Sequence, residues 1–254
     1  MGQIRDREWI WERLEKNRPW TAYALADLEP AYFEHTSWFC DADGNGLTLL
    51  YRGYSRPIIF CIESSDSAED ILSEIDATLD CSERYVVVEA ENATLIRTRY
   101  QTQTERPTLR MSLEAAKLRA APGFGVARLT PDHLHAVKAL YEEGPPEFFL
   151  DQMLTDGVYF GLFEGNELVA VAGTHIVSLQ YSVAGLGNVY TRRDRRSRGY
   201  ATRVTGAVSR ELLDMGIATI VLNVREENTT AIRIYSRLGF QACCRYFENV
   251  VSPR

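Results

Sequence analysis

The stretch Arg196-Ser197-Arg198-Gly199-Tyr200-Ala201 follows the apolar residues 186–190 and precedes a periodic helical segment that ends near Gly216. This order predicts a strand, a short basic loop and the start of a helix. The N-terminus of a helix carries unpaired backbone N–H groups and a partial positive charge, so it favours a bound anion. At Gly199 the main chain can approach such a ligand without a Cβ in the way. We therefore predict a phosphate-binding loop over residues 196–202.

The loop is strongly basic, although the chain as a whole is acidic. Residues 192–203 contain six arginines and one acidic residue, Asp194, whereas the chain has a formal net charge of −7. The excess acid lies in residues 1–120, with 14 basic and 21 acidic side chains, while residues 121–254 have 14 of each. Basic side chains concentrated on one loop favour a discrete anionic ligand over a long polyanion. Nucleic-acid binding is not expected, because few aromatic residues accompany the arginines.

Two blocks of sequence resemble one known family. The first, Arg196-x-x-Gly199-x-Ala201, is similar to the acyl-CoA pyrophosphate signature of the GNAT superfamily of N-acetyltransferases. The second resembles the next motif of that family, in the same order and spacing, and consists of Leu222-Asn223-Val224, Asn228, Ala231, Tyr235 and Leu238-Gly239-Phe240. The resemblance implies an α/β fold in which residues 116–254 form an acyl-CoA acyltransferase domain, with a mixed, largely antiparallel sheet flanked by helices.

The composition is typical of a soluble globular protein with one or two domains, at 254 residues, 45% hydrophobic and 25% charged. No apolar run is long enough to cross a membrane, and the N-terminus is charged where a signal peptide would be apolar. The five cysteines are scattered and lack metal-ligand spacing. We therefore expect a cytoplasmic protein with reduced thiols, no metal site and no membrane association.

Residues 1–115 are expected to form a smaller α/β domain. Their predicted helices and strands come in an order that parallels the second half of the chain, with helices at 5–16, 23–28 and 68–79 and strands at 37–40, 47–51, 58–62, 85–88 and 107–111. This half is therefore predicted to be a degenerate copy of the acyltransferase domain. At the position of the phosphate loop it has Glu63-Ser64-Ser65-Asp66-Ser67, without glycine or arginine. Because these carboxylates would repel a pyrophosphate, we expect a role in packing or homodimerisation, with substrate selection left open.

The second half is expected to follow the acyltransferase order after a small-residue helix in the connection at 113–127. We predict helices at 132–142, 147–154, 201–215 and 229–238, and strands at 126–129, 158–163, 168–176, 184–191, 217–224 and 240–250.

The resemblance also implies which residues hold acetyl-CoA, the expected cofactor. The strand residues Val189, Tyr190 and Thr191 would offer backbone groups to the pantetheine arm, and the amide of Val189 or Tyr190 would bind the thioester oxygen. The pyrophosphate would lie on the amides of the loop, which consists of Arg196, Ser197, Arg198, Gly199, Tyr200, Ala201 and Thr202.

Tyr235 matches the residue that acts in this family as the general acid, which protonates the CoA thiolate as it leaves. A phenol with an unperturbed pKa of about 10 is protonated at neutral pH and can pass its proton to sulfur. A core tyrosine would occupy the same helical position, and the surrounding motif favours the catalytic role. Asn228 is expected to contact the cofactor, to cap the following helix, or to do both.

The base that deprotonates the amine is less defined by the sequence. Residues 168–191 contain no acidic side chain, and His175 is the one group among them whose unperturbed pKa suits the task. A lone histidine in a strand is more often structural, so both roles stay open. Glu142, Glu143 and Glu147 fall in the region that covers the substrate in relatives, and could attract an ammonium or relay its proton through water.

These observations favour an acetyl-CoA-dependent N-acetyltransferase that joins an acetyl group to a primary amine by direct attack in a ternary complex. No cysteine lies in either motif, so a covalent acyl-enzyme is not expected. One alternative is a non-catalytic acyl-CoA-binding or regulatory protein. Another is an N-acyltransferase that moves a longer acyl group to an amino acid. The acceptor, whether a small-molecule or a peptide amine, is not defined by the sequence.

Overall fold

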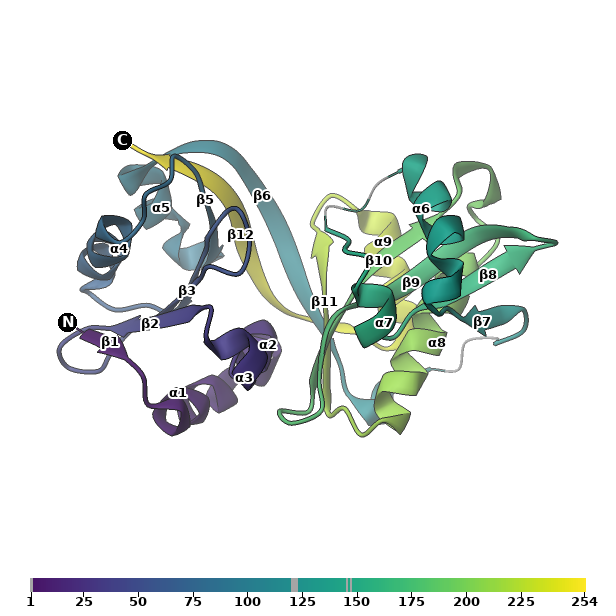
Figure 1. The fold of residues 1–254 in the computed structure, drawn as a ribbon, viewed down its shortest axis with the longest axis horizontal. Helices are drawn as coiled ribbons and strands as arrows, with labels where there is room; N and C mark the ends of the chain where they lie inside the picture. The colour runs from purple at the N-terminus through teal and green to yellow at the C-terminus, as the bar shows by residue number, and fades with distance from the viewer. Residues whose placement is uncertain (1, 120–122, 145, 147) are drawn as a thin grey trace. The chain divides into compact units, whose positions relative to one another are not determined.

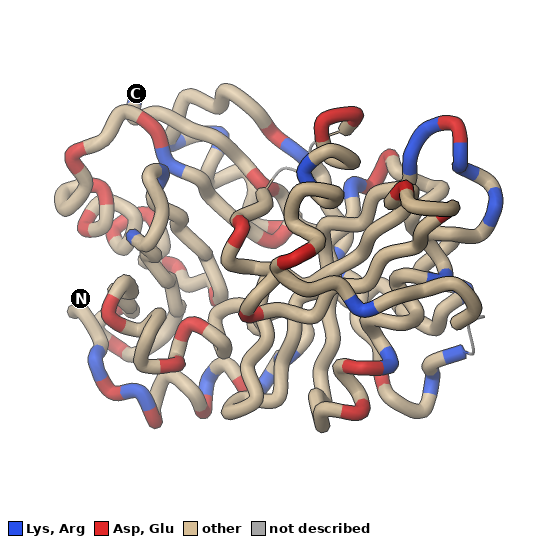
Figure 2. Tube along the Cα trace, turned by 45° about the vertical axis from the view of Figure 1, so that its right-hand side comes forward, with Lys and Arg blue, Asp and Glu red and all other residues tan. Residues whose placement is uncertain are grey.

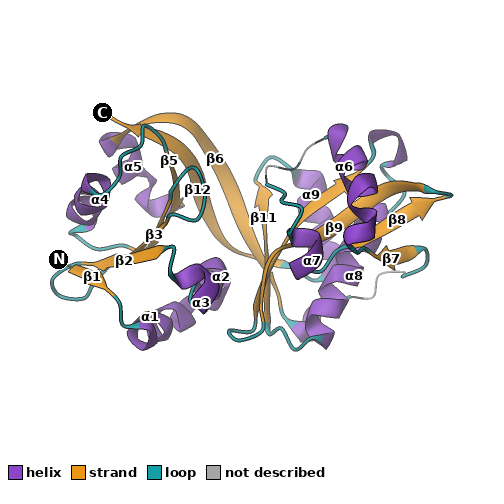
Figure 3. Ribbon diagram, in the orientation of Figure 1, coloured by secondary structure: helices purple, strands orange, loops and turns teal. Residues whose placement is uncertain are grey.

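A computed structural model describes residues 2–119, 123–144, 146 and 148–254. The chain divides into two compact units, of which unit 1 contains residues 1–110 and 243–254 and unit 2 contains residues 111–242. Helices and strands occur in both units (Figures 1 and 3). The α/β class predicted from the sequence is confirmed. Among the described residues, no helix is long and apolar enough to cross a bilayer.

Unit 1 is a sheet with strands in the order β1-β2-β3-β4-β5-β12-β6. Its strands are β1 (Gly2–Ile4), β2 (Thr36–Cys40), β3 (Leu47–Tyr51), β4 (Ile58–Glu63), β5 (Arg84–Glu89), most of β6 (Tyr100–Leu113) and most of β12 (Gln241–Pro253). Its α-helices are α1 (Arg7–Leu14), α2 (Arg18–Ala26), α3 (Pro30–Phe33), α4 (Ala68–Ala77) and α5 (Ala93–Arg99). Helices α4 and α5 pack on β4 and β5 through a core that includes Ile71, Ile75 and Ile96.

Unit 2 has the strand order β6-β11-β10-β9-β8-β7. Its own strands are β7 (Val126–Arg128), β8 (Phe160–Glu164), β9 (Glu167–Ser178), β10 (Val183–Thr191) and β11 (Thr219–Arg225). Its α-helices are α6 (Leu134–Glu142), α7 (Met153–Asp156), α8 (Tyr200–Asp214) and α9 (Thr229–Leu238). Helices α6 and α7 pack on β8 and β9 around Val137, Leu154 and Val171. Helix α8 packs against β7 to β10 and also contacts α9.

The two units repeat one topology. From β1 to β4 every neighbouring pair is antiparallel, and β4 and β5 are parallel with α4 between them in sequence. From β7 to β10 every neighbouring pair is again antiparallel, and β10 and β11 are parallel with α8 between them. The order of elements that the sequence showed in its two halves is therefore present in the strand pairing.

The terminal strands do not stay within the two halves of the chain. Residues 243–254 belong to unit 1, because β12 pairs antiparallel with β5, from Tyr246–Glu89 to Val251–Arg84. The sequence analysis placed these residues in the C-terminal domain and the boundary at 115/116, whereas the compact units divide between Arg110 and Met111. Sequence periodicity identifies a strand but carries no signal for its partner, which explains the difference.

Several predicted elements differ in extent. Of the small-residue helix expected at the connection, the structure shows one 3-10 turn, Ala115–Lys117, while Ala120 and Ala121 lie outside the described residues. The helix expected at 147–154 begins at Met153 and has four residues. The sequence analysis missed β1 and α5, since both are short. Helix α9 and its end at Gly239, where φ is 108°, are as predicted.

Two glycines that end helices allow a test of local packing. Gly216 and Gly239 both have positive φ, but a Cβ at Gly216 meets no atom within 4 Å, while one at Gly239 would collide with the carbonyl of Lys117. We expect Gly216→Ala to cost about 1–2 kcal/mol from the left-handed backbone alone. Gly239→Ala should cost about 1–3 kcal/mol more, because backbone must move. Urea unfolding of the two variants measures this difference, and equal midpoints would contradict the packing at Gly239.

Candidate active site

The loop before α8 has the backbone that an anion site needs. Gly199 is the N-cap of α8, with φ 76° and ψ 9°, and no side chain among the described residues caps this helix end. Ser197 also has a positive φ of 63°. A Cβ at Gly199 would meet no atom within 4 Å, so the space in front of the first-turn amides is open. These amides are therefore available to a ligand, and the residues fit the pyrophosphate predicted for them.

Three of the six arginines in residues 192–203 are paired with acids. Arg195 Nε and Arg198 Nη1 lie 2.8 and 3.2 Å from the carboxylate of Glu164, which also accepts a hydrogen bond from the Tyr200 hydroxyl. Arg192 pairs with Glu167 and with Asp194, at 2.6 and 2.8 Å. Figure 2 shows the basic residues of this loop with acidic residues among them. The local charge is thus lower than the sequence count suggests, because the β8–β9 hairpin supplies Glu164 and Glu167.

Strand β10 has an unpaired edge beside this loop. The pairs between β10 and β11 end at Leu186–Leu222, although β10 continues to Thr191. The Arg192 N–H donates to the Val169 carbonyl on β9. Because backbone groups alternate along an antiparallel strand, the N–H and C=O of Tyr190 also face β9, whereas those of Thr191 face the opposite side. The N–H of Tyr190 is therefore occupied on the β9 side. Alternation along the strand turns the Val189 N–H away from β9, beyond the last pair with β11, so Val189 is favoured over Tyr190 as the donor to the thioester oxygen.

Two polar side-chain atoms at this edge are buried and have no hydrogen-bond partner among the described residues, the hydroxyls of Tyr190 and Thr191. The guanidinium of Arg196 lies 5.8 Å from the centroid of the Tyr190 ring, and its Nε donates to the Thr191 carbonyl at 3.3 Å. A buried hydroxyl without a partner carries a free-energy cost. A polar ligand lying along β10 would offset it.

Asn188 interrupts β10 at the start of this edge. Its φ is 53°, a left-handed value that asparagine tolerates better than most residues, and the register with β9 shifts between Gly187 and Tyr190. Its side chain is 7% exposed. The Asn188 carbonyl accepts a hydrogen bond of 2.7 Å from Tyr141, and its Nδ2 donates to the Tyr159 hydroxyl at 2.8 Å. Buried hydrogen bonds therefore hold both the main chain and the side chain of the bulge.

His175 on β9 is held by the same residue. Its Nε2 lies 3.1 Å from Oδ1 of Asn188, and its ring contacts Phe148 edge to face at 6.5 Å between centroids. Tyr159 donates its one proton to the Thr174 carbonyl at 3.0 Å, so it accepts from Asn188 and leaves Oδ1 as an acceptor. Oδ1 of Asn188 is therefore the acceptor in this contact, and Nε2 of His175 is the donor.

Tyr235 has the protonation state that an acid needs. It lies on α9, is 8% exposed, and contacts Phe240 edge to face at 6.1 Å. Burial raises the pKa of its hydroxyl to about 12, so the proton stays on oxygen at neutral pH.

Asn228 caps α9, since its side chain accepts a hydrogen bond from the Ala231 amide at 3.1 Å. Strands β10 and β11 are parallel neighbours, so the Gly199 loop and Asn228 both follow the carboxyl ends of strands at one edge of the sheet. The topology therefore brings the two sequence motifs to a common edge.

Comparisons with known proteins agree with this arrangement. Residues 159–248 match the family model described as FR47-like protein, and a search of curated proteins finds no match. The fold is similar to that of a putative acetyltransferase of the GNAT family from Novosphingobium aromaticivorans, at 17% identity and a TM-score of 0.65, covering 93% of this chain and 99% of that chain. The chain therefore has the fold of the GNAT acetyltransferases.

Two further solved structures have the GNAT fold over most of the chain. A GCN5-related N-acetyltransferase from Kribbella flavida is 16% identical, with a TM-score of 0.62 and coverage of 92% of this chain and 96% of that chain. A tandem GNAT protein from the clavulanic acid biosynthesis pathway is 13% identical, with a TM-score of 0.56 and coverage of 85% and 82%.

The predicted substrate residues of this chain are only partly described. Glu142 and Glu143 are exposed at the end of α6, and Glu147 lies outside the described residues. Among the described residues, no group of three or more His, Cys, Asp or Glu side chains could hold a metal ion. A role for Glu142 and Glu143 toward an ammonium substrate stays a prediction.

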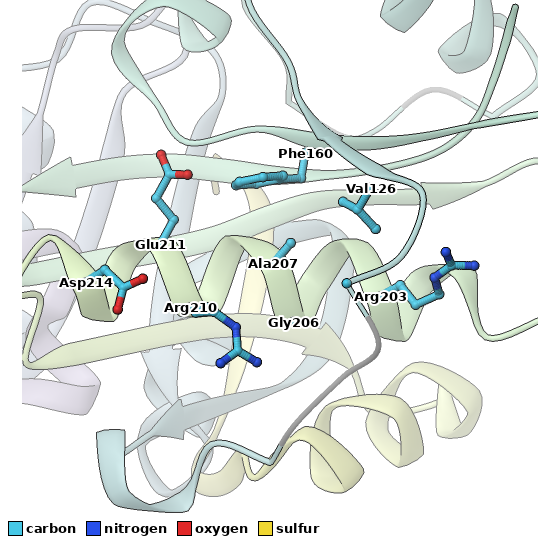
Figure 4. Close-up of a pocket in the computed structure, with 9 residues that line it drawn as sticks. Val126, Phe160, Arg203, Gly206, Ala207, Arg210, Glu211 and Asp214 are labelled. Carbon is cyan, nitrogen blue, oxygen red and sulfur yellow. The ribbon is translucent and has the colours of Figure 1, made fainter.

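A pocket of about 250 Å³ lies elsewhere on the unit, between α8 and the strands β7 and β8. Figure 4 shows Phe160 and Val126 across from Ala207, with Arg210 and Asp214 further along α8. Its lining includes none of the residues predicted to hold cofactor or to take part in catalysis. We assign no function to it.

Sequence reasoning missed the residues that hold the bulge. Asn188 lies on β10, Tyr141 on α6 and Tyr159 in the loop before β8, and no spacing along the chain links them. One signal was available, because Gly187-Asn188 inside an apolar strand is a pairing that often marks a bulge. Glu164 was assigned only to a hairpin turn, since its contact with the arginine loop depends on tertiary structure.

The anion site is tested with Gly199→Ala. The added Cβ would stand in front of the α8 amides, and loss of one charged hydrogen bond should weaken CoA binding by about 10-fold or more. Isothermal titration calorimetry with CoA gives the affinity. Gly216→Ala is the matched control, because it places the same strain at the other end of α8, with no predicted ligand. Equal CoA affinities for the two variants would refute the site.

Proposed function

We propose that the protein is an acetyl-CoA-dependent N-acetyltransferase that acts on a primary amine by direct attack in a ternary complex. The observation that carries this proposal is the uncapped, left-handed Gly199 at the start of α8, beside the edge of β10 that β11 leaves unpaired. An extended pantetheine arm and a pyrophosphate are the two chemical parts that such an arrangement suits. Acetyl-CoA would supply the activated acyl group.

The chain's own residues then have separate tasks. The loop residues 196–202 bind the pyrophosphate through main-chain amides, and the main chain of Val189 and Thr191 pairs with the pantetheine amides. The amide of Val189 donates to the thioester oxygen and stabilises the negative charge that develops there. The Arg196 guanidinium lies over the Tyr190 ring and donates to the Thr191 carbonyl. It therefore lies between the strand proposed to bind pantetheine and the loop proposed to bind the pyrophosphate.

Two side chains move the protons. His175 takes the proton that the amine loses as the new C–N bond forms. Tyr235 gives its proton to the thiolate released when the C–S bond breaks. Charge and atoms then balance as an amide, free CoA thiol, a protonated imidazole and a phenolate, and both side chains regain their starting states by exchange with water.

Unit 1 is proposed to be a degenerate copy that does not bind acyl-CoA. Where unit 2 has the glycine loop, unit 1 has Ser67 before α4, with φ −95° and no glycine. Glu63 there accepts a hydrogen bond of 2.9 Å from Arg13, and Ser65 packs against Gly46. We propose that unit 1 serves in packing or homodimerisation, and that the protein is cytoplasmic.

Activity is tested by measuring thiol release from acetyl-CoA with a panel of small-molecule and peptide amines. We expect turnover with at least one amine, and no fall in rate from pH 8 to pH 10, because an acid with a pKa of about 12 stays protonated there. Tight acetyl-CoA binding without thiol release would favour the non-catalytic alternative. A preference for a longer acyl-CoA with an amino acid as acceptor would favour the second alternative, an N-acyltransferase that acts on amino acids.

The role of Tyr235 is tested with Tyr235→Phe. We expect kcat at pH 7 to fall by about 100-fold with little change in acetyl-CoA affinity. The loss should shrink as the pH rises past the thiol pKa of about 8.5, because the thiolate can then leave without a proton. A variant that keeps its full rate at pH 7 would assign Tyr235 to the core instead.

A further inference from the structure

The bulge at Asn188 is held from two independent directions. On the side-chain side, Nδ2 donates to Tyr159 and Oδ1 faces His175, at 2.8 and 3.1 Å. On the main-chain side, the carbonyl oxygen accepts from the Tyr141 hydroxyl at 2.7 Å. The side-chain contacts fix where Asn188 lies. The contact with Tyr141 fixes how its peptide plane is turned.

Tyr141 is well placed to act as a rigid donor. It lies on α6, is 5% exposed, and its ring packs against Phe149 and Tyr190 at centroid distances of 5.2 and 6.4 Å. Its partner is a carbonyl, which can only accept, so the proton is on Tyr141. Burial raises its pKa well above the usual value and keeps that proton in place.

The orientation of one carbonyl determines the orientation of the next amide. The peptide unit from Asn188 to Val189 is planar and trans, since the described chain contains no cis peptide bond. In a trans unit the C=O and N–H point in opposite directions. The hydrogen bond to Tyr141 therefore directs the Val189 N–H away from α6, and Val189 is the amide that β9 leaves available.

We propose that Tyr141 is a positioning residue, whose hydroxyl holds the Asn188–Val189 peptide so that the Val189 amide points at the thioester oxygen. This inference rests on the proposed acyl transfer. Tyr141 touches neither substrate nor acyl group, and acts only through the peptide that it holds. Without the Tyr141 hydroxyl, the Asn188–Val189 peptide plane can rotate about the left-handed backbone. The Val189 N–H then no longer points at the thioester oxygen.

The direct readout is the polarisation of the bound thioester. In wild-type protein, acetyl-CoA labelled with ¹³C at the carbonyl should show a downfield carbonyl shift on binding, because a hydrogen bond from Val189 draws electron density to oxygen. In Tyr141→Phe the shift should return toward the free value. We expect kcat to fall by about 10- to 100-fold, with acetyl-CoA affinity changed less than about 3-fold.

Phe149→Leu is the packing control. It removes the ring contacts of Phe149 with Tyr141 and Tyr159 but keeps both tyrosine hydroxyls that bond to Asn188. The bound ¹³C shift of this variant should match wild type, and its unfolding midpoint serves as a reference for Tyr141→Phe. A lost shift in Phe149→Leu, with wild-type behaviour in Tyr141→Phe, would overturn the inference.

The outcomes separate this inference from the function on which it rests. If wild-type protein binds no acetyl-CoA and releases no thiol with any amine, the proposed function fails, and this inference fails with it. If wild type binds and polarises the thioester but Tyr141→Phe does so equally, with unchanged kcat, the inference alone is wrong. A kcat loss without any change in bound shift would likewise refute it, since it would place the effect of Tyr141 elsewhere.

Discussion

The left-handed backbone of Asn188 is the constraint on which the candidate site depends. It interrupts β10 just after the last pair with β11, so the strand continues to Thr191 with one edge open. A left-handed residue inside a strand carries a cost, and persists only where its surroundings fix it. Here Tyr141 and Tyr159, from opposite ends of the α6–β8 segment, provide buried hydrogen bonds to it. The open edge is therefore built into the core.

The electrostatics of the loop follow from a balance between arginines and acids. Glu164 pairs with Arg195 and Arg198 and accepts from Tyr200, and these contacts lower its pKa. With half of these arginines paired with acids, the uncapped amides at the start of α8 are a further set of donors for an anion. Main-chain amides do not depend on flexible side chains, so they suit a ligand that must be placed accurately.

Much of the fold could be predicted from the sequence. Helix α9 has the predicted bounds, and the strands β2, β3 and β10 lie within a residue of theirs, because alternating or helical apolar spacing and glycine stops are local signals. The loop before α8 and the cap at Asn228 also follow from local rules. Short elements such as β1 and α5 gave too few residues for a periodic pattern.

The sequence by itself determined the basic glycine loop, the helix α8 behind it and the capped helix α9, because helix caps, glycine and apolar spacing act over a few neighbouring residues. Only the tertiary structure decided that β12 pairs with β5 in unit 1, and that Glu164 pairs with Arg195 and Arg198. It also decided that the Tyr141 hydroxyl bonds to the carbonyl of Asn188. These contacts join residues far apart in the chain, so packing, not local preference, selects them.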